Sequence, residues 1–182
     1  MASTAKVFQL RISLDHINPP IWRRVIVPSS MRLRRLHGVV QATMGWTNSH
    51  LYHFRQDGRI FSRPNPDIGE YVEDDSTFRV DHLLMSPGDT MTYEYDMGDS
   101  WNHTVMLEEV VVPDSALKRA QCLAGARACP PEDCGGVMGY QNFLEAMLDP
   151  FHPEHRAMRA WVGGDFDPEA FDLVKANLRL RR

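Results

Sequence analysis

The chain has 182 residues, of which 43% are hydrophobic and 24% are charged, and this composition supports one compact core and excludes a disordered chain. No run approaches the roughly 20 apolar residues that span a bilayer, and residues 1–10 contain no apolar signal core. We therefore expect a cytoplasmic protein with no membrane partner. Three cysteines without a secretory signal argue against a disulfide framework and favour reduced thiols or metal ligands.

The net charge of −4 hides an uneven distribution. Residues 1–63 hold ten Lys or Arg against two acidic residues, a net charge of +8, so residues 64–182 carry −12. A basic half of this kind can bind an anionic partner such as nucleic acid, or it can attract the acidic half of the same domain. The candidate nucleic-acid-binding residues are Arg23, Arg24, Arg32, Arg34 and Arg35.

Residues 1–112 have the pattern of a sheet with one covering helix. Apolar and polar residues alternate at 8–14, and the prolines at 19–20 lead into a second strand at 21–27, which together predict a hairpin. Apolar residues recur at helical spacing through 31–46, with Ser30 placed to cap the helix and Gly45 to end it. The Asp57-Gly58 pair predicts a second hairpin between strands at 50–55 and 59–63.

The next segments predict a loop and a third hairpin. Residues 64–76 are acidic and rich in turn formers, which indicates an exposed loop, and a short helical turn is expected at 80–84. Apolar residues then alternate in strands at 91–95 and 101–107, joined by a turn at 96–100.

Beyond residue 113 the pattern changes to helices separated by proline and glycine turns. Three short helices are expected, beginning near Met138, Pro153 and Pro168, and Glu132 or Asp133 is expected to cap the first. The sequence thus predicts an α+β single domain over 1–182. Its 1–112 core is a mixed or antiparallel sheet with one main covering helix, β-grasp-like with additions, and a helical part at 113–182 packs on that core.

Two polar segments could carry chemistry. Carboxylates, aromatic rings and an imidazole gather around the 96–100 turn, and two further carboxylates lie in the 129–136 segment. If the segments meet, they form an acidic cleft that can bind a polar ligand or a divalent metal; otherwise these are turn formers, caps and packed rings. The candidate ligand-binding residues are Tyr95, Asp96, Asp99, Trp101, His103, Glu132 and Asp133.

The cysteines offer a second metal hypothesis. Cys122, Cys129 and Cys134, with His155 downstream, could form a Cys3His zinc site, although the cysteine spacings are not the paired short ones of structural zinc. The alternative is that the thiols are small buried side chains. His50 and His53 lie three residues apart on a predicted strand, so they should face opposite sides and not share an ion.

Five motifs together resemble the plasmid pRiA4b ORF-3-like family. They span nearly the whole chain in order, and are Pro-Pro-Ile-Trp-Arg-Arg at 19–24, Met-Gly-Trp at 44–46 with His-Leu-Tyr-His-Phe at 50–54, the 93–103 segment, Cys-Pro-Pro-Glu-Asp-Cys-Gly-Gly at 129–136, and the 149–155 segment. The resemblance implies a sheet-plus-helices fold of unknown function, found in bacteria and archaea and often with mobile DNA. It implies no catalytic residues.

The sequence lacks a phosphate-binding glycine loop, a nucleophile elbow and a His-Glu-x-x-His zinc motif. We therefore expect a non-enzymatic binding or interaction module, associated with mobile DNA and needing no cofactor. The alternative is a metal-dependent hydrolase or nuclease that uses Asp96, Asp99, His103 and Asp133 around zinc or another divalent metal.

Overall fold

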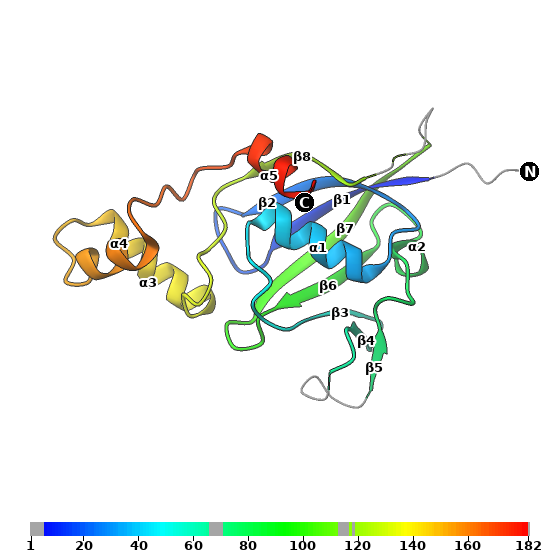
Figure 1. The fold of residues 1–182 in the computed structure, drawn as a ribbon, viewed down its shortest axis with the longest axis horizontal. Helices are drawn as coiled ribbons and strands as arrows, with labels where there is room; N and C mark the ends of the chain where they lie inside the picture. Colours follow the sequence, from blue (N-terminus) through cyan, green and yellow to red (C-terminus); the bar gives the residue numbers. More distant parts are fainter. Residues whose placement is uncertain (1–5, 66–70, 113–116, 118, 182) are drawn as a thin grey trace, which may run out of the picture.

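A computed structural model describes residues 6–65, 71–112, 117 and 119–181. Eight strands form one sheet in the order β5-β4-β3-β6-β7-β1-β2-β8, and every neighbouring pair is antiparallel except β4 and β5 (Figure 1). The strands are β1 (Val7–Leu14), β2 (Trp22–Pro28), β3 (Tyr52–Gln56), β4 (Arg59–Ser62), β5 (Val72–Asp74), β6 (Thr90–Tyr95), β7 (Trp101–Val111) and β8 (Gln121–Ala126). The helices are α1 (Leu33–Met44), α2 (Val80–Leu83), α3 (Gly136–Leu148), α4 (His155–Val162) and α5 (Leu173–Arg179).

The three predicted hairpins are confirmed. β1 pairs with β2, β3 with β4 and β6 with β7, and α1 lies across one face of the sheet (Figure 1). Leu33, Leu36 and Val40 of α1 are fully buried because the apolar stripe of the helix faces the sheet. Gly45 ends α1 with a left-handed φ of 108°, whereas Ser30 does not cap it, since the N-cap is Arg32 without a side-chain bond.

The region beyond residue 113 is not purely helical, which corrects the prediction for 113–182. β8 forms the edge of the sheet by pairing with β2, although only Cys122 of this strand is buried. A strand with so little apolar alternation depends on backbone hydrogen bonds to the neighbouring strand. Such pairing cannot be predicted from the residues of the strand itself. β5 likewise lies within the predicted 64–76 loop, of which 66–70 fall outside the described residues.

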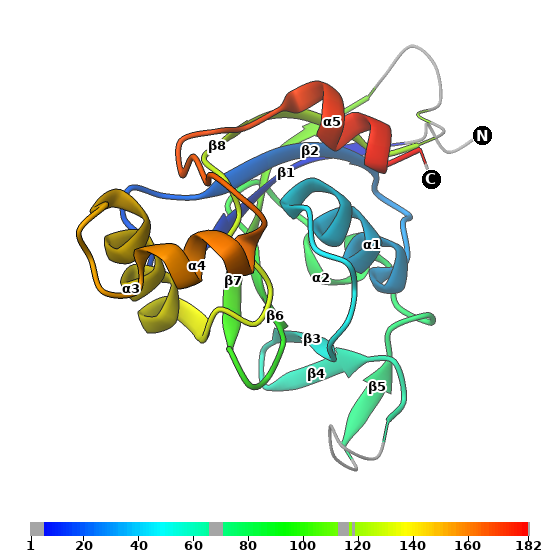
Figure 2. The ribbon, with the colours of Figure 1, turned by 60° about the vertical axis from the view of Figure 1, so that its left-hand side comes forward.

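The C-terminal helices attach to the sheet in two ways. α3 and α4 form a pair beside the sheet, with Phe143 of α3 packed against Trp161 of α4 at a ring distance of 5.8 Å (Figures 1 and 2). α5 contacts α1 and β8. α5 begins at Leu173, not near residue 168, because the carboxylate of Asp172 accepts the backbone N–H of Lys175 at 2.9 Å and caps the helix.

The structure confirms the α+β class, while the β-grasp likeness stays a prediction. No helix within the described ranges is long and apolar enough to cross a membrane. The chain between β8 and α3, residues 129–136, returns to the end of the β6–β7 hairpin (Figure 2). We call this segment the proline turn, and it positions the site described below.

Candidate functional site

The proline turn is held against two other segments by hydrogen bonds from each. The Trp46 indole, which follows α1, donates from Nε1 to the backbone oxygen of Pro130 at 3.0 Å. The Tyr95 hydroxyl, at the end of β6, donates to Oε1 of Glu132 at 2.5 Å. The backbone N–H of Gly135 donates to Oδ2 of Asp99 at 3.1 Å. The 96–100 turn and the 129–136 segment therefore meet.

Glu132 is the main polar contact of the proline turn with the 46–51 segment. Its carboxylate also accepts the backbone N–H of Thr47 at 3.2 Å and the Thr47 hydroxyl at 2.5 Å. Burial works to raise the pKa of Glu132, but the hydrogen bonds from Thr47 and Tyr95 outweigh it and the pKa lies below its usual value. Glu132 thus joins loops as a carboxylate and does not cap α3, whose N-cap is Gly135, so that prediction is wrong.

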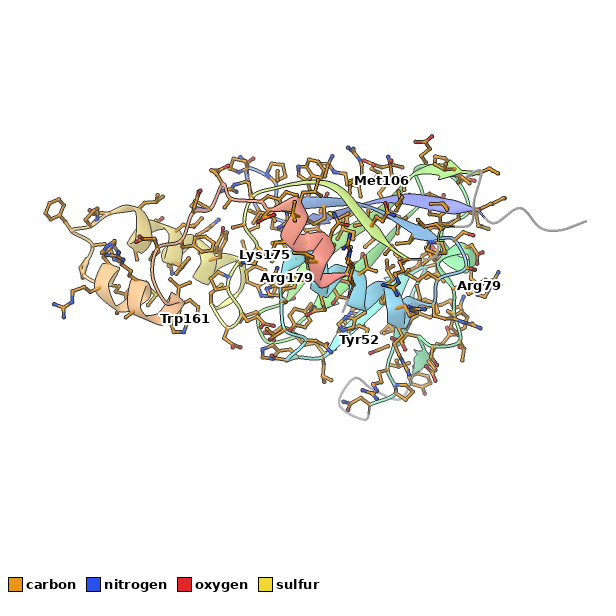
Figure 3. The ribbon with its side chains drawn as sticks, turned by 45° about the horizontal axis from the view of Figure 1, so that its top comes forward. Tyr52, Arg79, Met106, Trp161, Lys175 and Arg179 are labelled. Carbon is orange, nitrogen blue, oxygen red and sulfur yellow. The ribbon has the colours of Figure 1, made fainter. Side chains whose placement is uncertain are left out.

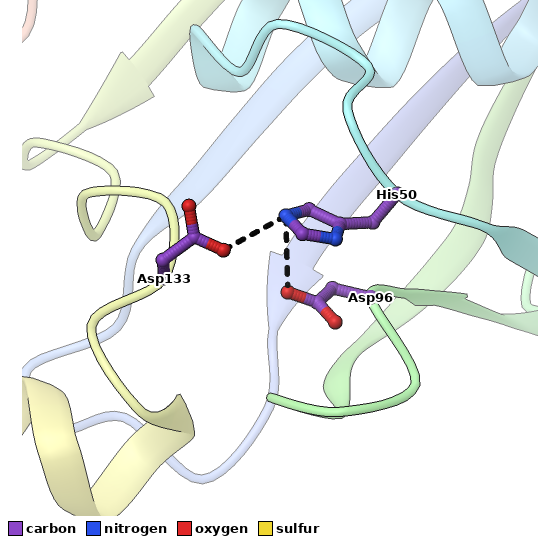
Figure 4. Close-up of side chains that lie close together, drawn as sticks. All are labelled: His50, Asp96 and Asp133. Carbon is purple, nitrogen blue, oxygen red and sulfur yellow. Dashed lines mark ion pairs between the residues drawn. The ribbon is translucent and has the colours of Figure 1, made fainter.

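His50, Asp96 and Asp133 converge where the three segments meet (Figure 4). Nε2 of His50 lies 2.9 Å from Oδ1 of Asp133 and 3.6 Å from Oδ2 of Asp96. One donor atom from each residue lies within 4.8 Å of the other two, and no other group of three His, Cys, Asp or Glu side chains does so within the described part of the chain. We call these three residues the His50 cluster.

Each carboxylate of the His50 cluster is presented by a tight turn. Asp96 has a φ of 56° and Asp133 a φ of 60°, which Asp adopts more readily than most residues because its short side chain can bond locally. Oδ1 of Asp96 accepts the backbone N–H of Gly98 at 3.0 Å, which leaves Oδ2 directed to His50. The orientation of the Asp96 carboxylate is therefore fixed by its own turn.

The close approach of the two turns requires glycine at position 136. A Cβ on Gly136 would lie 2.5 Å from the backbone oxygen of Asp99, and its φ is 67°. A side chain at this position would push the proline turn away from the β6–β7 hairpin. Gly136 thus determines how close Asp133 comes to Asp96.

The distances in the His50 cluster suit a metal ion. Ligands about 2.1 Å from a zinc ion are about 3.0 Å apart at a 90° angle and about 3.4 Å apart in a tetrahedron. The observed 2.9 and 3.6 Å bracket these values. Nε2 of His50 is also shielded from solvent and makes no hydrogen bond of normal geometry, although a carboxylate oxygen is 2.9 Å away. A ring nitrogen surrounded in this way is suited to ligate a cation.

The other predicted ring residues belong to the core. His103 is fully buried, and its Nδ1 lies 2.9 Å from the backbone oxygen of Trp101. Burial lowers the pKa of His103 to about 4, so the imidazole is neutral near pH 7. Trp101 is also buried, and Trp46 packs on both rings. Neither His103 nor Trp101 reaches the His50 cluster, contrary to the predicted set.

The cysteines do not form the predicted zinc site. Cys122, Cys129, Cys134 and His155 contribute to no group of three donors within the described residues. Nδ1 of His155 bonds instead to the backbone oxygen of Ala146 at 2.8 Å. Burial raises the pKa of Cys129 and Cys134, the latter to about 12, so both thiols keep their protons at neutral pH. The thiols pack against the hydrophobic core.

The five predicted nucleic-acid-binding arginines do not share one free surface. Arg23 is 2% exposed, and its guanidinium donates at 2.8 or 2.9 Å to the backbone oxygens of Trp22, Thr43, Ala126 and Arg127. Of the other four, which are half-buried or exposed, three have separate partners. Arg24 pairs with Glu108, Arg34 pairs with Asp74 and Asp75, Arg32 donates to the backbone oxygen of Thr77, and Arg35 has no described side-chain partner.

The sequence interpretation missed His50 as a site residue. His53 is not part of the His50 cluster, and its Nε2 lies 3.1 Å from Oε2 of Glu94. The missing signal was the pairing of β3 with β6. It aligns Tyr52 with Tyr95, and the backbone N–H of Asp96 bonds to the oxygen of Leu51, which brings His50 beside Asp96.

A family model, a relative and a solved structure each match nearly the whole chain. The family model described as plasmid pRiA4b ORF-3-like protein matches residues 6–175. An uncharacterized protein of Sinorhizobium fredii, y4hQ, is 41% identical over 178 residues, which cover 95% of this chain and 90% of the relative. The crystal structure of MM3350 from Methanosarcina mazei Go1, a protein of unknown function, is 32% identical, with a TM-score of 0.84 over 95% of this chain and 97% of that one. The chain belongs to the plasmid pRiA4b ORF-3-like family.

Proposed function

We propose that the protein is a non-enzymatic binding module whose His50 cluster holds one divalent metal ion. The observation that carries this proposal is the convergence of an imidazole nitrogen and two carboxylates from three separate segments. The hydrogen bonds of Glu132, Trp46 and Asp99 support the convergence from outside the cluster. Bringing two carboxylates together costs electrostatic free energy, which a bound cation offsets.

The donor set favours a transition metal over calcium or magnesium. Calcium and magnesium prefer ligands that are all oxygen, whereas one imidazole with two carboxylates is a set that zinc and manganese accept. The Asp133 side chain is 68% exposed, so the ion would remain open to solvent on that side. Three protein ligands would leave at least one coordination position for water or for a ligand of the module.

The test is a calorimetric titration of zinc and of manganese into chelator-treated protein. We expect one ion per chain and a loss of affinity of about tenfold or more in Asp133→Asn, because a neutral amide is a poorer ligand than a carboxylate. Asn tolerates the left-handed φ of Asp133, so the turn is kept. Asp57→Asn is the matched control, since Asp57 is exposed in the β3–β4 turn with a φ of 49°. Equal affinity in both variants would refute the site.

The alternative function is a metal-dependent hydrolase. Two observations favour it: the open side of the cluster at Asp133, and a pocket of about 670 Å³ that His50 lines together with Arg34 and Arg63. A bound metal would supply a water of lowered pKa at the cluster. Arg63 would hold an anionic substrate beside His50, since Arg34 is already paired with Asp74 and Asp75. His103 cannot take part, because it is buried in the core.

Hydrolysis of bis(p-nitrophenyl) phosphate by the zinc- or manganese-loaded protein separates the two functions. Turnover above that of the free metal, lost in Asp133→Asn and kept in Asp57→Asn, would establish the hydrolase. Metal binding without turnover supports the binding module.

A further inference from the structure

A second pocket, between α1 and α5, has an arginine-rich lining that the proposed metal site does not explain. It measures about 590 Å³, within the size range of small-molecule sites. Its described lining contains no Asp or Glu. Five arginines line it, namely Arg32, Arg35, Arg119, Arg179 and Arg181. We propose that this pocket binds a small molecule that carries two or more adjacent phosphate groups.

Three of these arginines are free to bind an anion. The side chains of Arg35, Arg119 and Arg181 make no ion pair or hydrogen bond with the described part of the chain. Arg32 donates to the backbone oxygen of Thr77, and the guanidinium of Arg179 lies against Gly45 in a neighbouring pocket. Several other arginines are paired with carboxylates, as Arg24 is with Glu108. The pocket instead gathers arginines that have no carboxylate partner among the described residues.

Three parts of the chain, far apart in sequence, build the pocket. Arg35 lies on the α1 face that contains Gly38 and Ala42, Arg119 precedes β8, and Arg179 and Arg181 lie at the C-terminal end of α5 and just beyond it. Contact between α1 and α5 brings these parts together, and Figure 3 shows Arg179 on α5 beside α1. The arginines are gathered by the fold and not by a run of basic sequence.

The size of the pocket makes the clustered charge significant. A sphere of 590 Å³ is about 10 Å across, close to the Debye length of about 8–10 Å in physiological salt. Charges around such a volume repel one another with little screening, and a bound anion removes that repulsion. Guanidinium groups pair with phosphate oxygens in a planar, bidentate geometry. Several guanidiniums around one small volume therefore suit a ligand with adjacent phosphates better than they suit a ligand with a single carboxylate.

A small ligand fits this site better than a nucleic-acid backbone does. The arginines surround a concave volume, whereas binding along a strand requires cations spread over an extended surface. Three of the arginines first considered for nucleic acid are committed elsewhere: Arg23 to backbone oxygens, and Arg24 and Arg34 to carboxylates. We therefore treat binding of an oligonucleotide as an outcome of the test.

The test is a titration of inorganic pyrophosphate into metal-free protein at low salt, so that the His50 cluster cannot contribute through a bound ion. We expect saturable binding that weakens steeply as salt rises. Arg35→Gln and Arg181→Gln should each weaken it by about tenfold, the equivalent of one charge-assisted hydrogen bond. Arg156→Gln is the matched control, because Arg156 is exposed on α4 and has no described partner. Thermal unfolding of each variant checks that the fold is kept.

Three results would overturn the proposal. The first is no pyrophosphate binding at low salt, and the second is an equal loss of affinity in Arg35→Gln and Arg156→Gln. The third is binding of a 12-nucleotide single strand without binding of pyrophosphate, which would indicate an extended surface instead of a pocket. Binding of pyrophosphate that both pocket variants weaken, with the control unchanged, would support it. None of these readouts depends on the metal site.

Discussion

Replacing Glu132 with Gln tests whether the proline turn is held in place as the geometry indicates. The substitution keeps the shape of the side chain and removes its charge. In the native protein the carboxylate accepts hydrogen bonds from the Thr47 backbone N–H, the Thr47 hydroxyl and the Tyr95 hydroxyl. The two hydroxyls donate to different oxygens of the carboxylate, so the single oxygen of a neutral amide can accept only one of these bonds, and without charge assistance.

The cost follows from the difference between charged and neutral hydrogen bonds. A hydrogen bond to a charged group contributes about 1.5–3 kcal/mol, and a neutral one contributes about 0.5–1.5 kcal/mol. Weakening one hydroxyl bond and losing the other therefore predicts a loss of at least about 2 kcal/mol in the free energy of unfolding. The native contribution of Glu132 depends on pH, because its folded-state pKa is lowered. The contribution is present above the pKa of the unfolded carboxyl group and is lost as the pH falls through the folded-state pKa.

The assay is urea unfolding of the wild type, Glu132→Gln and the control Glu109→Gln at several pH values. Glu109 is exposed on β7 and has no described side-chain partner. We expect Glu132→Gln to be less stable at pH 7 and the difference to shrink at acidic pH. A stability equal to that of Glu109→Gln at pH 7 would refute the role assigned to Glu132.

Three further outcomes follow from the structure. Gly136→Ala should lose at least about 1 kcal/mol more unfolding free energy than Gly163→Ala in urea, because both have positive φ but only position 136 is obstructed; equal losses would contradict this. In an NMR pH titration, His103 should stay neutral down to about pH 4, so its contribution to stability is complete above pH 6.5 and decreases by up to about 3 kcal/mol toward pH 4. A midpoint near 6.5 would exclude it from the core. Arg23→Met should destabilise the fold by about 3–5 kcal/mol in urea, since it removes a charge-assisted hydrogen bond from each of four backbone oxygens. A loss under 1 kcal/mol would show that those bonds contribute little.

Local patterns predicted the sheet core because its signals are periodic. Alternation at 8–14, the Asp57-Gly58 turn and the helical stripe of α1 each specify an element without reference to distant residues. β8 carries no such pattern and forms only because β2 offers it an edge. The start of α5 was misplaced because the sequence offers two possible N-cap residues, Asp167 and Asp172. In the structure Asp172 caps the helix.

The candidate site was predicted in part. Asp96 and Asp133 were singled out as polar residues in turns, and whether those turns meet depended on contacts between segments distant in sequence. For the same reason, His103 was predicted to be a site residue but lies in the core, whereas His50 was not predicted and lies in the site. Strand register places His103 inward beneath Trp46, whereas the pairing of β3 with β6 brings His50 to the end of the hairpin. The environments of the arginines also depend on tertiary packing. Packing buries Arg23, and it brings Arg35 and Arg181 to the same pocket.

A crystal structure of the zinc-loaded protein, with anomalous diffraction recorded at the zinc edge, tests the central claim most directly. We predict one anomalous peak about 2.0–2.2 Å from Nε2 of His50 and from an oxygen of each of Asp96 and Asp133. A peak at the cysteines, or full zinc loading with no peak at the His50 cluster, would contradict it.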